Sequence, residues 1–205
     1  HGELGGAVCV VIAGEVVVDL WGGVRDMASG ARWSADTMTL VHSTTKGLSA
    51  MVLALLHSGG LLDYDKRVAA YWPEFAQAGK EDITVRQLLA HSAGMHGARA
   101  LVLEPNDILD WDRMTQRLAA AAPAWEPGSR HGYQAITYGW LVGEVIRRVA
   151  GYASVNEAVR VEIAGVANRR LFTSNARVRG TVARPISSSI YASMITSIQY
   201  RSCTV

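Results

Sequence analysis

The stretch HSTTKGLSA at positions 42–50 decides how this sequence is expected to fold. It places Ser43 three residues before Lys46, at the beginning of a segment whose apolar residues recur at helical spacing. That spacing predicts an amphipathic helix that begins near Ser43 and ends at the pair Gly59-Gly60. The apolar positions of this helix are Leu48, Met51, Val52, Leu55 and Leu56.

The spacing of Ser43 and Lys46 has a chemical consequence. Residues three apart share one face of a helix, so the Lys46 amine can lie beside the Ser43 hydroxyl. The helix N-terminus also favours negative charge that develops on the serine oxygen. Lysine is normally protonated at neutral pH, so Lys46 could accept the serine proton only where its surroundings favour the neutral amine. The alternative is that Ser43 merely caps the helix and Lys46 is a solvated residue of its first turn.

The elements on both sides of this helix are predicted from their own patterns. Before it, two β-branched runs joined by Ala13-Gly14-Glu15 predict an antiparallel hairpin. After it the chain is mainly helical, with Thr84 capping a short helix and Pro123 ending a longer one. Strands are expected at residues 7–12 and 16–20, and helices at 83–91, 107–122, 136–150 and from 154 to about 163.

Length and composition indicate a globular chain. With 205 residues, of which 49% are apolar, it can bury a core in one sizeable domain or a small pair. No apolar run reaches the roughly 18 residues that a membrane span needs. The first residues also lack the charged and apolar regions of a signal peptide. We therefore expect no membrane partner and a cytoplasmic location, while the oligomeric state stays open.

Charge is distributed unevenly along the chain. The formal net charge is +2, yet all 18 acidic residues lie at or before Glu162, and every charged residue after it is basic. Residues 166–205 therefore form an atypical basic tail with weak periodicity. Its arginines are scattered and no RNA-binding motif accompanies them, so we expect no nucleic-acid partner.

The sequence does not indicate a metal or an organic cofactor. Cys9 and Cys203 are its only cysteines, and His91 and His96 have no acidic or cysteine neighbour at ligand spacing. The glycine pairs lack the pattern of a phosphate-binding loop. We therefore expect that the chain uses neither.

Four segments, in order, resemble the serine β-lactamase-like family, especially the class C β-lactamases and the family VIII carboxylesterases. They are residues 42–50, LLDYD at 61–65, DITVRQLLAHSAG at 82–94 and WEPG at 125–128. The resemblance implies an α+β fold of the serine β-lactamase/DD-peptidase type, with an antiparallel sheet flanked by helices and a helical region at about 61–135. It also implies a serine hydrolase that cleaves small carboxylic esters through an acyl-enzyme on Ser43, with Lys46 as proton acceptor.

The same resemblance points to Tyr133 as the third catalytic residue. Many family members carry Tyr-x-Asn at this place, where this sequence has Tyr133-Gln134-Ala135. The phenol would relay a proton between Ser43 and the leaving group. Ala135 lacks the amide that would hold the substrate, which favours an esterase over a β-lactamase or D-Ala-D-Ala carboxypeptidase with the same three residues. The structural alternative for Tyr133 is a packed aromatic side chain.

Ser92 is a competing nucleophile. It lies in AHSAG at positions 90–94, one residue short of the G-x-S-x-G nucleophile elbow. That elbow needs a strand before the serine and a helix after it, whereas here a helix precedes and a loop follows. We therefore expect Ser92 to be a structural turn residue.

One family motif has no counterpart. The resemblance implies a Lys-Thr-Gly, His-Thr-Gly or Trp-Gly-Gly on a later strand, but the last lysine is Lys80 and the last histidine is His131. Residues 1–165 are therefore interpreted as the N-terminal portion of the domain, with its C-terminal strands missing. That strand would supply one oxyanion donor, whose loss costs about 3 kcal/mol of transition-state stabilisation. A truncated, non-catalytic remnant is thus a further alternative.

Overall fold

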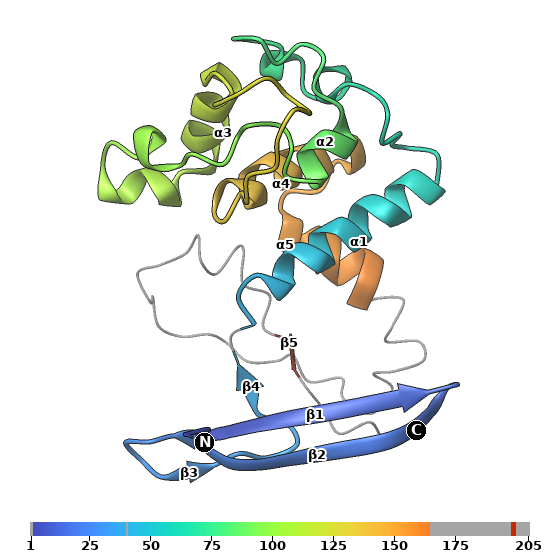
Figure 1. Ribbon diagram of the computed structural model, residues 1–205. Helices are drawn as coiled ribbons and strands as arrows, with labels where there is room; N and C mark the ends of the chain where they lie inside the picture. The colour runs from blue at the N-terminus through green and yellow to red at the C-terminus, as the bar shows by residue number, and fades with distance from the viewer. Residues whose placement is uncertain (1, 40, 165–197, 200–205) are drawn as a thin grey trace. The chain divides into compact units, whose positions relative to one another are not determined.

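The computed structural model describes residues 2–39, 41–164 and 198–199. The chain divides into two compact units, of which the first comprises His1–Val41 with Thr196–Val205 and the second His42–Ile195. The described part of the first unit holds the strands and that of the second holds the helices (Figure 1). Apart from residues 198–199, the predicted basic tail lies outside the described residues.

The first unit is built on a long antiparallel hairpin. Strands β1 (Gly5–Ile12) and β2 (Glu15–Asp26) pair along the whole of β1, and the short strand β3 (Ala31–Arg32) pairs with the far end of β2. Strands β4 (Met38–Thr39) and β5 (Ile198–Gln199) form a separate two-stranded sheet. The predicted hairpin is confirmed, and its second strand runs six residues further than residue 20.

The hairpin turns through two residues in the left-handed region. Ala13 has φ 52° and Gly14 has φ 88°. Positive φ at both central residues matches the right-handed twist of the flanking strands, and this geometry is favoured in two-residue hairpins. A turn after Ile12 thus sets the register in which Ile12 lies opposite Glu15.

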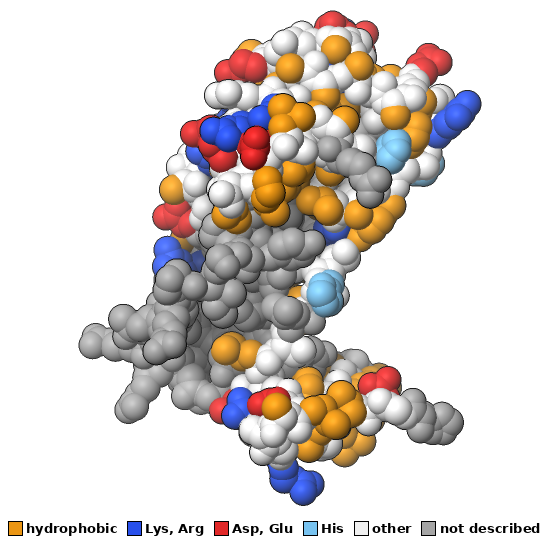
Figure 2. All heavy atoms as spheres, turned by 90° about the vertical axis from the view of Figure 1, so that its left-hand side faces the viewer, with side chains coloured by type: hydrophobic (Ala, Val, Ile, Leu, Met, Phe, Trp, Pro, Cys, Tyr) orange, Lys and Arg blue, Asp and Glu red, His pale blue; other side chains and the backbone are white. Residues whose placement is uncertain are grey.

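Much of the apolar surface of the hairpin is exposed. Seven of its large hydrophobic side chains are between 38% and 64% accessible, and Figure 2 shows hydrophobic side chains gathered on the surface of this unit. The exposed side chains are Val8, Val10, Val11, Ile12, Val17, Leu20 and Trp21. The hairpin therefore contributes little to the hydrophobic core.

The second unit is organised around α4 (Thr137–Ala150), which contacts every other α-helix of the described chain. These helices are α1 (Thr44–Ser58), α2 (Val85–Leu89), α3 (Trp111–Ala120) and α5 (Val155–Ala158), the last continued by the π-helical segment η5 (Val159–Ala164). Short 3-10 helices connect them: η1 (Val68–Ala70), η2 (Pro73–Phe75), η3 (Arg99–Leu101) and η4 (Pro105–Leu109).

The core lies on the inward faces of these helices. Five apolar side chains of α4 are fully buried, and they pack with residues of α1, α3 and the connecting segments. The core members on α4 are Trp140, Leu141, Val142, Val145 and Ile146. No helix among the described residues is long and apolar enough to cross a membrane.

Local sequence signals explain where several helices begin and end. The Thr84 hydroxyl accepts the Gln87 N–H while the Gln87 side chain accepts the Thr84 N–H, which is a capping box at the start of α2. Ser154 caps α5 by accepting the Glu157 N–H. At the C-terminal end of α4, Gly151 adopts φ 72°, the left-handed conformation that commonly ends helices. The helices expected from near Ser43 to Gly59-Gly60, over 83–91 and over 136–150 are thus confirmed, with observed bounds of 44–58, 85–89 and 137–150.

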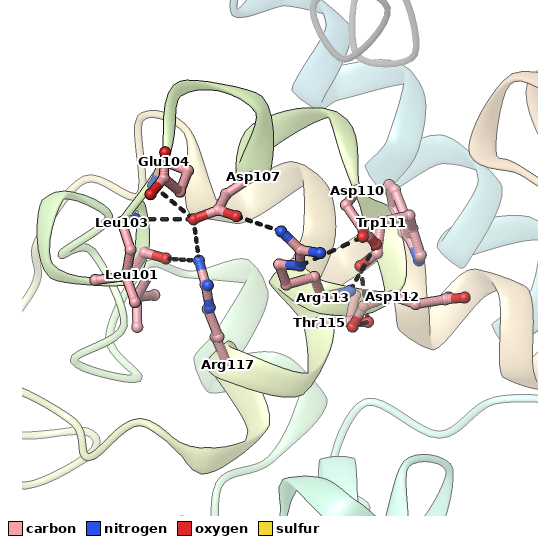
Figure 3. Close-up of polar contacts among 10 residues, drawn as sticks. All are labelled: Leu101, Leu103, Glu104, Asp107, Asp110, Trp111, Asp112, Arg113, Thr115 and Arg117. Atoms are coloured by element: carbon pink, nitrogen blue, oxygen red, sulfur yellow. Dashed lines mark hydrogen bonds and ion pairs between the residues drawn. The ribbon is translucent and has the colours of Figure 1, made fainter.

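The expectation of one helix over residues 107–122 is wrong. The segment is divided into η4 and α3, and Asp110 caps α3 by accepting the Arg113 N–H at 2.9 Å. The division falls at Asp110, whose backbone is extended with φ −99° and ψ 103°. The fully buried Asp107 carboxylate accepts the N–H groups of Leu103 and Glu104, which caps the start of η4 (Figure 3).

Candidate active site

Ser43 stands at the entrance of α1. His42, immediately before it, has φ 44°, a left-handed conformation that is uncommon for a residue with a side chain. This bend turns the chain into the helix at Ser43, whose hydroxyl makes no capping bond with the first turn. The Ser43 side chain is exposed and its oxygen is bonded by two other side chains instead. The capping alternative therefore does not describe its contacts.

Lys46 directs its amine toward Ser43 and toward a distant carbonyl. Its Nζ donates to Ser43 Oγ at 3.2 Å and to the Ala135 carbonyl oxygen at 2.8 Å. It also lies 4.9 Å from the centre of the Tyr133 ring, within range of a cation–π interaction. The side chain is half-buried, so it is not the freely solvated residue of the alternative interpretation.

Tyr133 completes the group from a loop 90 residues away. Its hydroxyl donates to Ser43 Oγ at 2.6 Å. Hydrogen bonds with Ser43 and Lys46 lower the pKa of this phenol below its ordinary value of 10. The side chain is 55% exposed, so it is not a packed core aromatic. Tyr138 takes that role, and burial raises its pKa to about 12.

The loop that carries Tyr133 is tied to the end of α2. The Gly128 N–H donates to the Ser92 carbonyl and the Gly132 N–H to the His91 carbonyl, both at 2.9 Å. Gly132 packs so closely on the indole of Trp125 that a Cβ there would lie 2.2 Å from the ring. These contacts fix the backbone immediately before Tyr133.

Ser92 does not have the surroundings of a nucleophile. It follows helix α2, is buried, and donates its hydroxyl hydrogen to the Gln87 carbonyl at 3.2 Å. A nucleophile elbow would require a strand before it. The residue closes the end of α2, as expected of a turn residue.

Two residues of the site, Ala135 and His91, make contacts that were not predicted from the sequence. The Ala135 carbonyl holds the Lys46 amine, although Ala135 was notable only for the amide that it lacks. His91 packs edge-on against the Tyr133 ring at 5.1 Å, and its Nδ1 accepts the Gln134 N–H at 3.2 Å. The only hint was the place of His91 in a segment that resembles the family. Among the described residues, no group of three or more His, Cys, Asp or Glu side chains could hold a metal ion.

Sequence comparisons place these residues in a family. Residues 1–183 match the family described as Beta-lactamase. The esterase/beta-lactamase LipL of Mycobacterium tuberculosis (strain ATCC 25618 / H37Rv) is 44% identical over 147 residues, which cover 72% of this chain and 34% of LipL. Esterase EstB of Burkholderia gladioli is 29% identical over 166 residues, which cover 73% of this chain and 42% of EstB.

Solved structures give the same result for the fold. A family VIII carboxylesterase is 48% identical with a TM-score of 0.72, and the match covers 77% of this chain and 42% of that one. A penicillin-binding protein homologue from Caulobacter crescentus is 44% identical with a TM-score of 0.76, covering 82% of this chain and 44% of that one. The expected fold, an antiparallel sheet with helices of the serine β-lactamase/DD-peptidase type, is confirmed.

The chain spans between about a third and under half of the length of these relatives. Within that span, the family match includes Ser43, Lys46 and Tyr133, and it extends beyond residue 165, where the N-terminal portion of the domain was expected to end. A match over residues 1–183 covers most of the sequence. The chain therefore belongs to the Beta-lactamase family.

Proposed function

We propose that this chain carries the nucleophile, proton acceptor and proton relay of a serine carboxylesterase that acts on small-molecule esters. The observation that supports it most directly is the convergence of Lys46 Nζ and Tyr133 OH on the Ser43 oxygen, at 3.2 and 2.6 Å. A nucleophile within hydrogen-bonding reach of a base, which is itself held by another group, is the arrangement that activates a serine. The chain spans less than half of the length of its relatives. The esterase activity of the whole protein is therefore also proposed.

The surroundings of Lys46 support its role as the acceptor. None of the described residues forms an ion pair with Lys46. Its polar partners are the Ser43 hydroxyl, the Ala135 carbonyl and the Tyr133 hydroxyl. A neutral amine can donate to the carbonyl and still use its lone pair for the Ser43 proton. This geometry allows Lys46 to accept the Ser43 proton.

The reaction then proceeds in two stages. As Ser43 Oγ attacks the ester carbonyl carbon, its proton moves to Lys46 Nζ, and the Ser43 N–H at the start of α1 stabilises the oxyanion. When the carbon–oxygen bond to the alcohol breaks, Tyr133 gives its hydroxyl proton to the leaving oxygen and is reprotonated from Lys46. Water then attacks the acyl-enzyme, and its proton returns by the same groups to Ser43 Oγ as the acid leaves.

Ester hydrolysis is favoured over β-lactam or D-Ala-D-Ala peptide hydrolysis by the residue at position 135. At position 135 the chain offers Lys46 a main-chain carbonyl and offers a substrate no side-chain amide. The named relatives include esterases, an esterase/beta-lactamase and a penicillin-binding protein homologue. Comparing turnover of a short-chain nitrophenyl ester with that of a chromogenic cephalosporin separates the two proposals. Faster turnover of the cephalosporin would favour the second.

Covalent labelling of the full chain tests the nucleophile. A fluorophosphonate should modify Ser43, as mapped by mass spectrometry, and Ser43→Ala should abolish the adduct. Ser92→Ala, the matched control, should be labelled like the unmodified chain. An adduct on Ser92 would show that the assignment is wrong. A folded chain with no adduct would instead identify it as a non-catalytic remnant.

A further inference from the structure

His91 occupies a position that usually belongs to glycine. It follows α2 with φ 59°, in a turn where the Ser92 N–H donates to the Gln87 carbonyl and the His91 N–H to the Leu88 carbonyl. This pair of bonds is the Schellman ending of a helix, whose left-handed residue is most often glycine because a Cβ is disfavoured there. The conformation alone therefore does not explain a histidine at this position.

The histidine contacts explain its presence. The His91 carbonyl accepts the Gly132 N–H at 2.9 Å, and its Nδ1 accepts the Gln134 N–H at 3.2 Å. Between these two bonds, its ring packs edge-on against the Tyr133 ring with centroids 5.1 Å apart. The centroid of the same ring lies 5.1 Å from that of the buried Tyr138 ring, so His91 packs against both tyrosines. One residue thus holds the backbone on both sides of Tyr133 and the ring itself.

The bond to the Gln134 backbone depends on a proton. Nδ1 lies 3.2 Å from both the Gln134 nitrogen and the Gln134 side-chain oxygen. An unprotonated Nδ1 accepts the backbone N–H, whereas a protonated Nδ1 donates to the amide oxygen and releases that N–H. Burial lowers the pKa of His91 below its ordinary value of 6.5.

Near neutral pH the ring is thus uncharged. Among the described residues, the titratable groups around it are Lys46 from α1, His131 and Tyr133 from the loop before α4, and Tyr138 from α4. None of them is a carboxylate that would favour a protonated ring. An uncharged His91 can keep its bond to the Gln134 backbone at the pH where an esterase of this kind would act.

We propose that His91 is the positioning residue that holds the Tyr133 phenol at Ser43 and Lys46. This inference rests on the proposed esterase function for its catalytic meaning, but the positioning itself can be measured without turnover. If His91 only ended the helix, replacing it by glycine should leave the position of Tyr133 and the labelling of Ser43 unchanged. His91→Gly removes the ring and Nδ1 yet suits the left-handed backbone, so the helix ending should be at least as stable.

The test uses the full chain and three variants. In His91→Gly, Tyr133 should move away from Ser43 and Lys46, so its pKa should rise toward 10 and fluorophosphonate labelling of Ser43 should slow at least tenfold. His91→Asn, whose side-chain oxygen can replace Nδ1 and which tolerates positive φ, should restore most of both. Ser92→Ala, which loosens the same turn without contacting Tyr133, should change neither. The Tyr133 pKa is read from the carbon-13 shift of its hydroxyl-bearing ring carbon, assigned with Tyr133→Phe.

A pH signature separates positioning from packing. The Tyr133 carbon resonance should show a small second step below pH 6.5 as His91 protonates, and His91→Asn should lack it. The inference is overturned if His91→Gly leaves both the Tyr133 pKa and the labelling rate unchanged. If Ser43 is not labelled in the unmodified chain, the esterase proposal fails, and the Tyr133 titrations still decide whether His91 positions the phenol.

Discussion

Lys46 holds its amine between the side-chain hydroxyl of Ser43, three residues away, and the main-chain carbonyl of Ala135, 89 residues away. The first of these contacts was predictable, because a separation of three residues on a helix fixes it locally. The second was not, since every residue carries a carbonyl and only the folded loop selects Ala135. Tyr133 was predicted from a resemblance, and neither spacing nor periodicity could have brought it to Ser43.

Replacing Lys46 by arginine tests whether the amine must become neutral. Arginine keeps the positive charge but does not lose its proton in proteins, so it cannot accept one from Ser43. We expect Lys46→Arg to reduce nitrophenyl ester turnover at least about a hundredfold, the lower end of general-base contributions. Lys66→Arg, at an exposed lysine beyond α1, is the matched control and should be fully active. Near-normal turnover by Lys46→Arg would refute proton transfer to residue 46.

At the scale of elements, the helix ends were more predictable than helix continuity. The capping box at Thr84 and the glycine that ends α4 are local, so the sequence indicates them directly. The division between η4 and α3 was missed because it falls at Asp110, where the backbone is extended although no glycine or proline marks the position. Asp107 pairs with Arg113 and Arg117 at the same time as it binds the loop before it, and no helical period reveals this.

The Asp107 cluster should make stability depend on acid. Hydrogen bonds from Arg117 and Arg113 hold the pKa of Asp107 well below its usual range. Its stabilisation is therefore present above the unfolded-state value of about 3.9 and is lost as the pH falls toward the lower folded-state value. We expect Asp107→Asn to lower the thermal midpoint at pH 7 and to flatten its decline in acid.

Asp112→Asn provides the comparison for Asp107. Its carboxylate is 80% exposed and lies 3.9 Å from Arg147, so its removal should shift the midpoint little. Thermal unfolding followed by circular dichroism from pH 7 to pH 3 measures both variants. Equal midpoints for Asp107→Asn and the unmodified chain across this range would contradict the inferred role of the cluster.

Two glycines in helices should respond in opposite directions to alanine. A Cβ at Gly143 in α4 would lie 2.6 Å from both Trp111 and Val155, whereas a Cβ at Gly47 in α1 would meet nothing within 4 Å. We expect Gly143→Ala to destabilise the fold by about 1–3 kcal/mol through overpacking. Gly47→Ala should stabilise it by up to about 1 kcal/mol through helix propensity. Denaturant unfolding gives both values, and stabilisation by Gly143→Ala would refute the close packing of α4.

For the whole molecule, the sequence predicted a sheet-forming start and a helical middle but not their division into two units. The hairpin pattern was clear from its β-branched runs. How much of it would be buried depends on which elements cover it, and a local pattern does not contain that information. Val8, Ile12 and Leu20 are exposed in strands that look apolar enough for a core.

Hydrogen exchange should report this difference between the units. The core side chains of α4 are fully buried, whereas the hairpin exposes most of its large apolar residues. Because isolated hairpins are only marginally stable, we expect amides of β1 and β2 to exchange at least about tenfold faster than those of Trp140–Ile146. Mass spectrometry of peptic fragments measures both segments in one sample. Equal protection would mean that the hairpin is covered in solution.

The bond between Tyr133 and Ser43 closes an excursion of ninety residues. Both ends of this excursion are anchored within a few ångströms of the same oxygen, and the chain between them folds back on its own core. Exposed turns inside it can therefore be lengthened, shortened or exchanged while the reactive oxygen keeps its neighbours. For protein engineering, these exposed turns are the positions to vary, whereas the core-forming helices between the two ends, together with Lys46 and His91, must be preserved.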